Sequence, residues 1–290
     1  MLKCQALTGK KLPCKNNGVV RLNGCYHCFW HDKYPPRPCE AMIPLSDEER
    51  KSSFLTEFNA KIKDVVLTNS SFDGSIGHQV EKLLGISPNS SQEPDYKGLE
   101  IKSHGGSKIT FFDLTPVSMY GKGRSKNGLT FNANFCQWFG SQNVKKDNRW
   151  SWSGKICPSY YGQWSQGGQI LGVSANGAIQ ITYNYERDQR LCKEVVVPLD
   201  LRKNDQLIVV WERAQLENAL RKFRSGFALI GHNKRTFTNC DVTTRPITYD
   251  NFITLFRERK IIFDSGRYAT NNRPYSQFRT TTNVLKAFCN

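Results

Sequence analysis

The spacing of apolar residues predicts two amphipathic helices in the first third of the chain. Residues 46–66 begin with a capping serine, and their apolar positions recur three or four residues apart, as on one face of a helix. Residues 70–86 show the same spacing, and Gly85 is placed to stop that helix. Each segment is therefore expected to bury one apolar stripe.

Alternating and continuous apolar runs predict strands in most of the remaining chain. The segments with this pattern are 98–103, 108–117, 177–186, 193–201, 205–213 and 227–235. A helix is expected over 214–225, and a helix followed by a strand over 248–264. Because helices and strands mix without strict βαβ alternation, the predicted fold class is α+β, with a central mixed sheet flanked by helices.

The charge of the chain narrows the possible partners. Its 290 residues include 41 Lys and Arg against 25 Asp and Glu, a formal net charge of +16. The basic residues are spread along the whole length, a distribution typical of proteins that bind nucleic acid. No apolar run of about 18 residues occurs, and the start lacks an apolar signal core. We therefore expect an intracellular, cytoplasmic protein with no membrane partner.

The cysteines are unevenly distributed, because five of the ten lie within the first 39 residues. A disulfide framework would be spread through the fold, whereas clustered cysteines beside histidines are typical of a metal site. The candidate zinc ligands are Cys4, Cys14, Cys28 and His31, spaced C-x9-C-x13-C-x2-H. Cys25, His27 and Cys39 are alternatives for the third and fourth ligand positions.

The segment "PDYKGLEIKSH" brings two acids and a lysine close together. Residues two apart on a strand share a face, so Glu100 and Lys102 point the same way, and Asp95 can curl back from the preceding loop. Paired carboxylates bind a hard cation such as Mg²⁺, and an adjacent lysine can position water and offset charge on a phosphate. Glu81 and His104 are two further candidates. Glu81 lies on the preceding helix and is either aimed at this site or solvated, and His104 lies on the same face of the strand.

Residues 74–103, "GSIGHQVEKLLGISPNSSQEPDYKGLEIKS", resemble the core of the PD-(D/E)xK nucleases. In particular they are similar to the MvaI/BcnI-like type II restriction endonucleases and, more distantly, to the mismatch-repair nicking enzyme MutH. By position, the resemblance implies that Glu81 is the helix glutamate, Asp95 and Glu100 are the Mg²⁺ carboxylates, and Lys102 is the catalytic lysine.

A second segment, "IIFDSGRYATNNRPYSQFRTT", is similar to the terminal part of that family, where a Phe-Asp pair, a basic loop and a Phe-Arg pair line the DNA groove. The resemblance implies DNA contacts by Asp264, Arg267, Arg273 and Arg279. The histidine-rich part of the family's loop is missing here, so the residues that read bases are not assigned.

These observations predict a zinc-binding module over residues 1–40 and an endonuclease domain over 41–290. Within the latter, the catalytic core is expected at about 70–120 and the DNA-groove segments at 120–190 and 240–285. The function implied by the resemblance is a Mg²⁺-dependent, sequence-specific endonuclease of bacterial or phage type, a monomer acting on double-stranded DNA at a short, CCNGG-like site. The alternatives are a repair-type or phage nicking endonuclease and a zinc-containing DNA-binding protein that does not cleave.

Overall fold

The computed structural model describes residues 45–68, 75–86, 93–121, 128–271 and 274–289, without the side chains of 128–130, together with the backbone at 20–22 and 25–27. The chain divides into two compact units, Met1–Ser46 and Asp47–Asn290. No helix in the described part of the chain is both long and apolar enough to cross a membrane.

In the first unit, strand β1 (Val20–Leu22) pairs antiparallel with β2 (Cys25–His27). The four proposed zinc ligands, Cys39 and the predicted boundary after residue 40 lie outside the described residues. The zinc module therefore stays a prediction.

The second unit contains helices and strands in mixed order. The helices are α1 (Asp47–Lys61), α2 (Ser75–Leu83), α3 (Gly128–Phe139), α4 (Lys193–Val196), α5 (Arg213–Leu220), α6 (Tyr249–Arg257) and α7 (Thr282–Lys286). The 3-10 turns are η2 (Val144–Lys146), η3 (Gly154–Ile156), η4 (Leu199–Leu201) and η5 (Arg221–Phe223). The strands are β3 (Glu100–His104), β4 (Lys108–Asp113), β5 (Ser118–Met119), β6 (Ser141–Asn143), β7 (Arg149–Trp152), β8 (Gly167–Val173), β9 (Ile179–Asp188), β10 (Gln206–Trp211), β11 (Phe227–His232), β12 (Phe237–Thr243), β13 (Ile261–Ser265), β14 (Arg267–Tyr268) and β15 (Ser276–Thr281).

The sheet that carries the predicted catalytic strand has the order β12–β11–β3. Strand β11 runs antiparallel to β12 and parallel to β3, with Phe227 opposite Glu100 and Leu229 opposite Lys102. The other sheets of this unit have the orders β13–β15–β4, β5–β10–β9–β8 and β14–β7–β6, and their pairs are antiparallel. Between the strands that the structure describes, one pair is parallel and the others are antiparallel, which confirms the α+β class.

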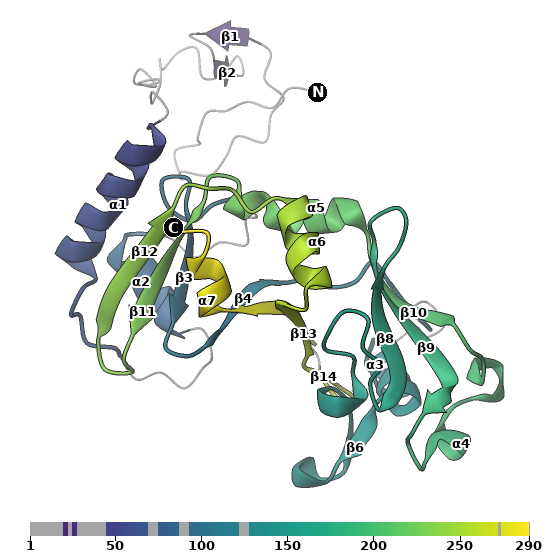
Figure 1. Cartoon of the computed structure of the whole chain (residues 1–290). Helices are drawn as coiled ribbons and strands as arrows, with labels where there is room; N and C mark the ends of the chain where they lie inside the picture. The colour runs from purple at the N-terminus through teal and green to yellow at the C-terminus, as the bar shows by residue number, and fades with distance from the viewer. Residues whose placement is uncertain are drawn as a thin grey trace. The chain divides into compact units, whose positions relative to one another are not determined.

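The two faces of the β12–β11–β3 sheet are covered differently. Helix α1 packs against β12 and α2 against β3 (Figure 1), burying Phe54 and Val80 in a core shared with Ala228 and Ile230. The opposite face joins a larger core through Phe227 and Leu229. Because residues opposite one another in a sheet point to the same face, Glu100 and Lys102 lie on the side away from α1 and α2.

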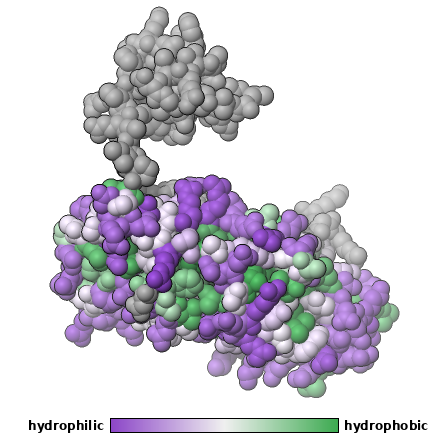
Figure 2. Space-filling view, turned by 45° about the horizontal axis from the view of Figure 1, so that its top comes forward, coloured by the Kyte–Doolittle hydropathy of each residue, from purple (hydrophilic) through white to green (hydrophobic). Residues whose placement is uncertain are grey.

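The larger core is rich in aromatic side chains. Phe278 on β15 lies with its ring centroid 5.4 Å from those of Phe112 on β4 and Trp211 on β10, and 5.8 Å from that of Phe252 on α6. Such contacts add to the area that each ring buries and fix the elements relative to one another. Hydrophilic residues cover most of the face shown in Figure 2, with apolar residues between them.

Most predicted elements occur where the apolar pattern placed them, and one prediction is wrong. Residues 193–201 were expected to form a strand, but they form α4 and η4. Pro198 has no N–H to donate to a ladder. The preceding strand β9 is already paired on both sides, with β8 and with β10, so it offers no free edge to these residues.

Candidate active site

A tight turn brings Asp95 next to Glu100. Tyr96 and Leu99 pair across it through two backbone hydrogen bonds of 3.0 and 2.8 Å. The two central residues, Lys97 and Gly98, have φ values of 48° and 86°, which is the left-handed backbone that such a two-residue turn requires. The residues just outside the turn, Asp95 and Glu100, therefore face each other. The backbone N–H of Ile101 donates to Asp95 Oδ2 at 2.9 Å and fixes that carboxylate.

Strand β3 places a lysine against the second carboxylate. Lys102 Nζ lies 2.6 Å from Glu100 Oε1, and the Glu100 side chain is only 4% exposed. The Lys102 ammonium also lies 5.5 Å from the centroid of the buried Phe223 ring. The three residues predicted from the "PDYKGLEIKSH" segment are thus brought together on one face of β3.

A second lysine, which sequence reasoning did not identify, completes the cluster. Lys222 on η5 places its Nζ 3.0 Å from the same Glu100 oxygen, and its side chain is 17% exposed. In the sequence it is one of several basic residues at the end of a predicted helix, 120 positions after Lys102. Only the parallel pairing of β11 with β3 brings it to the site.

The two carboxylates experience opposite electrostatic environments. Burial, and then the charge of Glu100, raise the pKa of Asp95 to about 6. Burial acts in the same direction on Glu100, but Lys102 and Lys222 outweigh it and hold the Glu100 pKa below its ordinary value. Burial, followed by the like charge of Lys102, lowers the pKa of Lys222. A pair of carboxyl groups with opposite pKa shifts is typical of a functional site.

The donor set fits a hard divalent cation. Two facing carboxylates supply oxygen ligands, and Mg²⁺ is commonly bound by one or two carboxylates with water and substrate phosphate completing its octahedron. Among the described residues, no group of three or more His, Cys, Asp or Glu side chains is arranged to hold a metal. Burial is the main cause of the raised Asp95 pKa, and the repulsion from Glu100 that adds to it is the interaction that a cation between the carboxylates would relieve.

Two other predicted catalytic residues lie apart from this cluster. Glu81 on α2 pairs with His78 of the same helix, Oε2 to Nδ1 at 3.2 Å. Helix α2 packs on the opposite face of β3, where an added Cβ at Gly77 would lie 4.0 Å from Ser103 Oγ. His104 lies at the far end of β3. Burial lowers its pKa, and the charges that also affect that pKa include Lys286 but neither Asp95 nor Glu100.

The predicted DNA-contact residues fall into different environments. Arg279 and Asp264 come together across β15 and β13 in a half-buried ion pair, Nη1 to Oδ2 at 2.8 Å. Arg267 was expected to contact DNA at the surface, but the structure buries it. It is 4% exposed, donates to Asn132 Oδ1 and lies near the Phe135 ring. Its place opposite Trp152 in the β14–β7 pair turns it inward.

Arg273, the remaining predicted DNA contact, lies outside the described residues.

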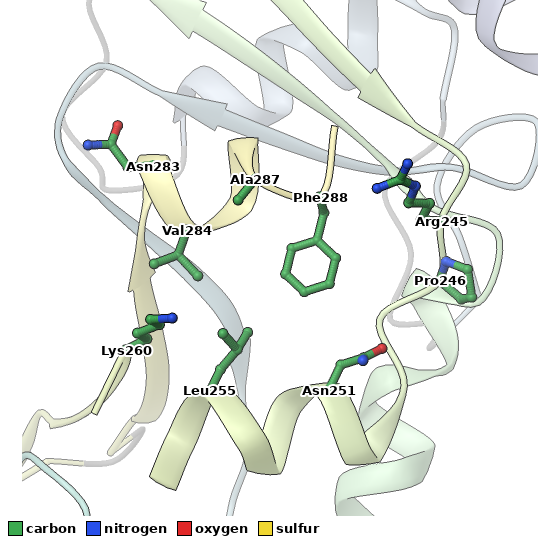
Figure 3. Close-up of a pocket in the computed structure, with 9 residues that line it drawn as sticks. All are labelled: Arg245, Pro246, Asn251, Leu255, Lys260, Asn283, Val284, Ala287 and Phe288. Atoms are coloured by element: carbon green, nitrogen blue, oxygen red, sulfur yellow. The ribbon is translucent and has the colours of Figure 1, made fainter. Parts of the chain in front are cut away.

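A separate cavity of about 780 Å³ lies between α6, α7 and the segment after β12 (Figure 3). Leu255, Val284 and Phe288 give it an apolar lining, with Arg245 and Lys260 at its edges. No residue of the Asp95–Glu100 cluster lines this cavity. The candidate chemistry is therefore carried by the strand surface of β3 and not by this pocket.

Comparison with known proteins places this arrangement in context. A family model described as LlaMI restriction endonuclease matches residues 57–288. The type II restriction enzyme ScrFI of Lactococcus lactis subsp. cremoris is 31% identical over 249 residues, covering 78% of this chain and 90% of that enzyme. The solved complex of restriction endonuclease MvaI with its cognate DNA substrate has a similar fold, with a TM-score of 0.55 at 15% identity over 84% of this chain and 97% of that one.

The family match and the identity to ScrFI define the protein as a site-specific deoxyribonuclease of the type II restriction class. More particularly, the chain belongs to the LlaMI restriction endonuclease family. The prediction of a restriction endonuclease is thereby confirmed, and a DNA-binding protein that does not cleave is disfavoured.

Proposed function

We propose that the protein cuts double-stranded DNA at a short, CCNGG-like site in a Mg²⁺-dependent reaction, with Asp95, Glu100 and Lys102 as the catalytic residues. The observation that carries this proposal is the contact of Lys102 with Glu100 at 2.6 Å beside a second carboxylate whose pKa is raised. The site preference and monomeric action come from the resemblance to MvaI/BcnI-like enzymes.

In this proposal each side chain has a separate task. Asp95 and Glu100 would hold the cation, which when bound would supply Lewis-acid stabilisation of the charge that develops on the phosphate. The Ile101 N–H keeps Asp95 oriented toward Glu100. Lys102 orients the attacking water and donates to the charge that builds up in the transition state. We assign Glu81 and His104 no part in the chemical step, because Glu81 pairs with His78 on its own helix and His104 lies at the far end of β3.

The basic character of the chain supplies the remaining DNA affinity. With a formal net charge of +16, the protein attracts the phosphate backbone over a wide surface. We assign Arg279, with Asp264 beside it, and Arg273 to contacts in the groove. Arg267 is assigned instead to holding α3 against β14, since its guanidinium is buried.

The direct test uses plasmid and short duplexes with and without CCNGG sequences, incubated with Mg²⁺ and then with a chelator. We expect discrete fragments from DNA that contains the site, and no cutting in the chelator. Transient nicked circles would support one-strand-at-a-time action by a monomer. Full activity without divalent ions would contradict the two-carboxylate mechanism, and nicking without linear product would favour the repair-type alternative.

We further propose that the first forty residues bind one structural zinc through Cys4, Cys14, Cys28 and His31. Elemental analysis should find about one zinc per chain, which is expected from a closed four-ligand site. Cys14→Ser should lose the metal, whereas the matched control Cys240→Ser, a free cysteine of the second unit, should keep it. Absence of zinc from the wild-type protein would contradict this assignment.

A further inference from the structure

The position of Lys222 is fixed by rigid elements on both sides. It is the middle residue of η5, which follows α5 directly, and the next residue, Phe223, is fully buried. Gly226 then turns the chain at a φ of 96°, where an added Cβ would lie 1.9 Å from Thr243 O, so only glycine fits. The N–H of Glu100 donates to Gly226 O at 3.3 Å. Lys222 is thus held in register with Glu100.

Both lysines are held against the same two groups. Their ammonium nitrogens lie 2.6 and 3.0 Å from Glu100 Oε1, and 5.5 and 5.8 Å from the centroid of the Phe223 ring. One buried carboxylate oxygen therefore serves two cations. Removing an ammonium group from water costs free energy unless a partner compensates it. Glu100 already pairs with Lys102, so pairing with Glu100 does not by itself explain why a second lysine is buried here.

The charge balance indicates what that reason is. With Asp95 and Glu100 ionised, the two lysines make the cluster neutral. A divalent cation between the carboxylates would leave a surplus of positive charge that only an anion can offset. In a deoxyribonuclease the anion that must reach this point is the phosphate of the DNA backbone.

The distances agree with such a contact. Lys222 Nζ lies 3.0 Å from Glu100 Oε1, so a phosphate brought to a cation at that carboxylate would meet an ammonium group beside it. Of the two lysine contacts with Glu100, that of Lys222 is the longer. A phosphate oxygen can therefore compete with Glu100 for the Lys222 ammonium more easily than for that of Lys102.

We propose that Lys222 is a second catalytic lysine, which donates a hydrogen bond to a non-bridging oxygen of the scissile phosphate while Lys102 serves the attacking water. The inference rests on the proposed function of Asp95 and Glu100 as metal carboxylates. Lys222 stays protonated throughout, and its hydrogen bond strengthens as charge accumulates on the phosphate oxygens.

The first measurement is single-turnover cleavage at saturating Mg²⁺ of a duplex that the wild-type enzyme cuts. Lys222→Met keeps the length of the side chain but removes its charge, and should slow cutting about a hundredfold, as expected for loss of one transition-state donor. Lys222→Arg should recover part of the rate. The control Lys61→Met breaks an exposed lysine–glutamate pair on α1 and should cut within about threefold of wild type, a typical surface effect.

The second measurement needs no cleavage. Affinity is measured with Ca²⁺ in place of Mg²⁺, for the same duplex with a normal phosphate or an uncharged methylphosphonate at the scissile position. Lys222→Met should weaken binding of the normal duplex about tenfold, which corresponds to one charge-assisted hydrogen bond. With the methylphosphonate, wild type and variant should bind alike.

The outcomes separate this inference from the function on which it rests. An equal loss of affinity for both duplexes would show that Lys222 acts only through folding or through Glu100, and would overturn the phosphate contact. A cleavage rate for Lys222→Met close to that of wild type would overturn it as well. If the wild type cuts no duplex at all, the proposed function fails and this inference fails with it.

Discussion

Glu100 and Asp188 are both buried carboxylates beside basic side chains, but their surroundings differ. Asp188 on β9 accepts from Tyr183 at 2.9 Å and from Arg190 Nη2 at 2.6 Å, and Arg190 donates onward to the carbonyl groups of Gly140 and Trp138. Every charge in that network has partners within the protein. At Glu100, by contrast, two lysines share one oxygen and a second carboxylate faces it.

The difference separates a structural ion pair from a site prepared for a ligand. A satisfied buried network joins elements of the fold, here β9 to the end of α3. A cluster with unrelieved repulsion costs stability and persists where a cation or substrate completes it.

Glu100→Gln should reduce DNA cutting roughly a thousandfold or more, because it removes a negative charge from the proposed metal site. The protein should remain folded, since the amide keeps the shape of the side chain. Single-turnover cleavage and thermal melting of the same preparation provide the check. Cutting at more than a tenth of the wild-type rate would exclude Glu100 as a metal ligand.

Asp188→Asn should have the converse effect. Removing one partner of a buried ion pair leaves Arg190 with an uncompensated charge, and we expect the free energy of unfolding to fall by about 3 kcal/mol. Cutting at low temperature, where the variant is still folded, should match wild type. Denaturant unfolding measures the first quantity. A cleavage defect in fully folded protein would mean that this network also serves the site.

Asp95→Asn should abolish cutting and yet stabilise the metal-free protein. The folded-state pKa of Asp95 is raised to about 6 from an ordinary value of 3.8, so its charged form is disfavoured by folding. The penalty is fully present above pH 6 and disappears as the pH falls toward 3.8. Because the group is partly exposed, solvent screening reduces the expected gain to about 1 kcal/mol at pH 8.

Unfolding of wild type and Asp95→Asn in chelator, at pH 8 and at pH 5, measures that gain. The stability difference should be smaller at pH 5. A variant less stable than wild type at pH 8 would show that the carboxylate is held favourably and that the site is not under electrostatic strain.

Arg279→Ala should have the smallest effect. It removes a half-buried ion pair with Asp264, so stability should change by less than about 1 kcal/mol. If Arg279 contacts a phosphate, DNA affinity should fall and the slope of log K against log salt should decrease by about one. Arg267→Ala, by comparison, should destabilise the fold. Unchanged salt dependence for Arg279→Ala would remove that residue from the DNA interface.

The part of the site that is local in sequence could be predicted from the sequence. Asp95, Glu100 and Lys102 flank one tight turn and one strand, so strand alternation and a short preceding loop suffice to bring them together. The helical stripes of α1 and α2 were recognisable for the same reason, since their periodicity depends only on neighbouring residues.

The parts that depend on tertiary pairing could not be predicted. Lys222 reaches Glu100 only because β11 pairs in parallel with β3, and no local pattern marks that register. Arg267 looked like a groove residue, but its strand pairs with β7 and directs it inward. The sequence left Glu81 either aimed at the site or solvated, and no local pattern shows that α2 packs on the other face of β3.

Single-turnover cleavage by Lys102→Ala, with a gel-shift assay on the same preparation, tests whether the active site lies on β3. Lys102 contacts Glu100 and acts on the chemical step, so its loss should slow cutting at least roughly a thousandfold and leave specific DNA binding within about threefold of wild type. Cutting by Lys102→Ala at close to the wild-type rate would contradict the account, and the active site would have to lie elsewhere than on β3.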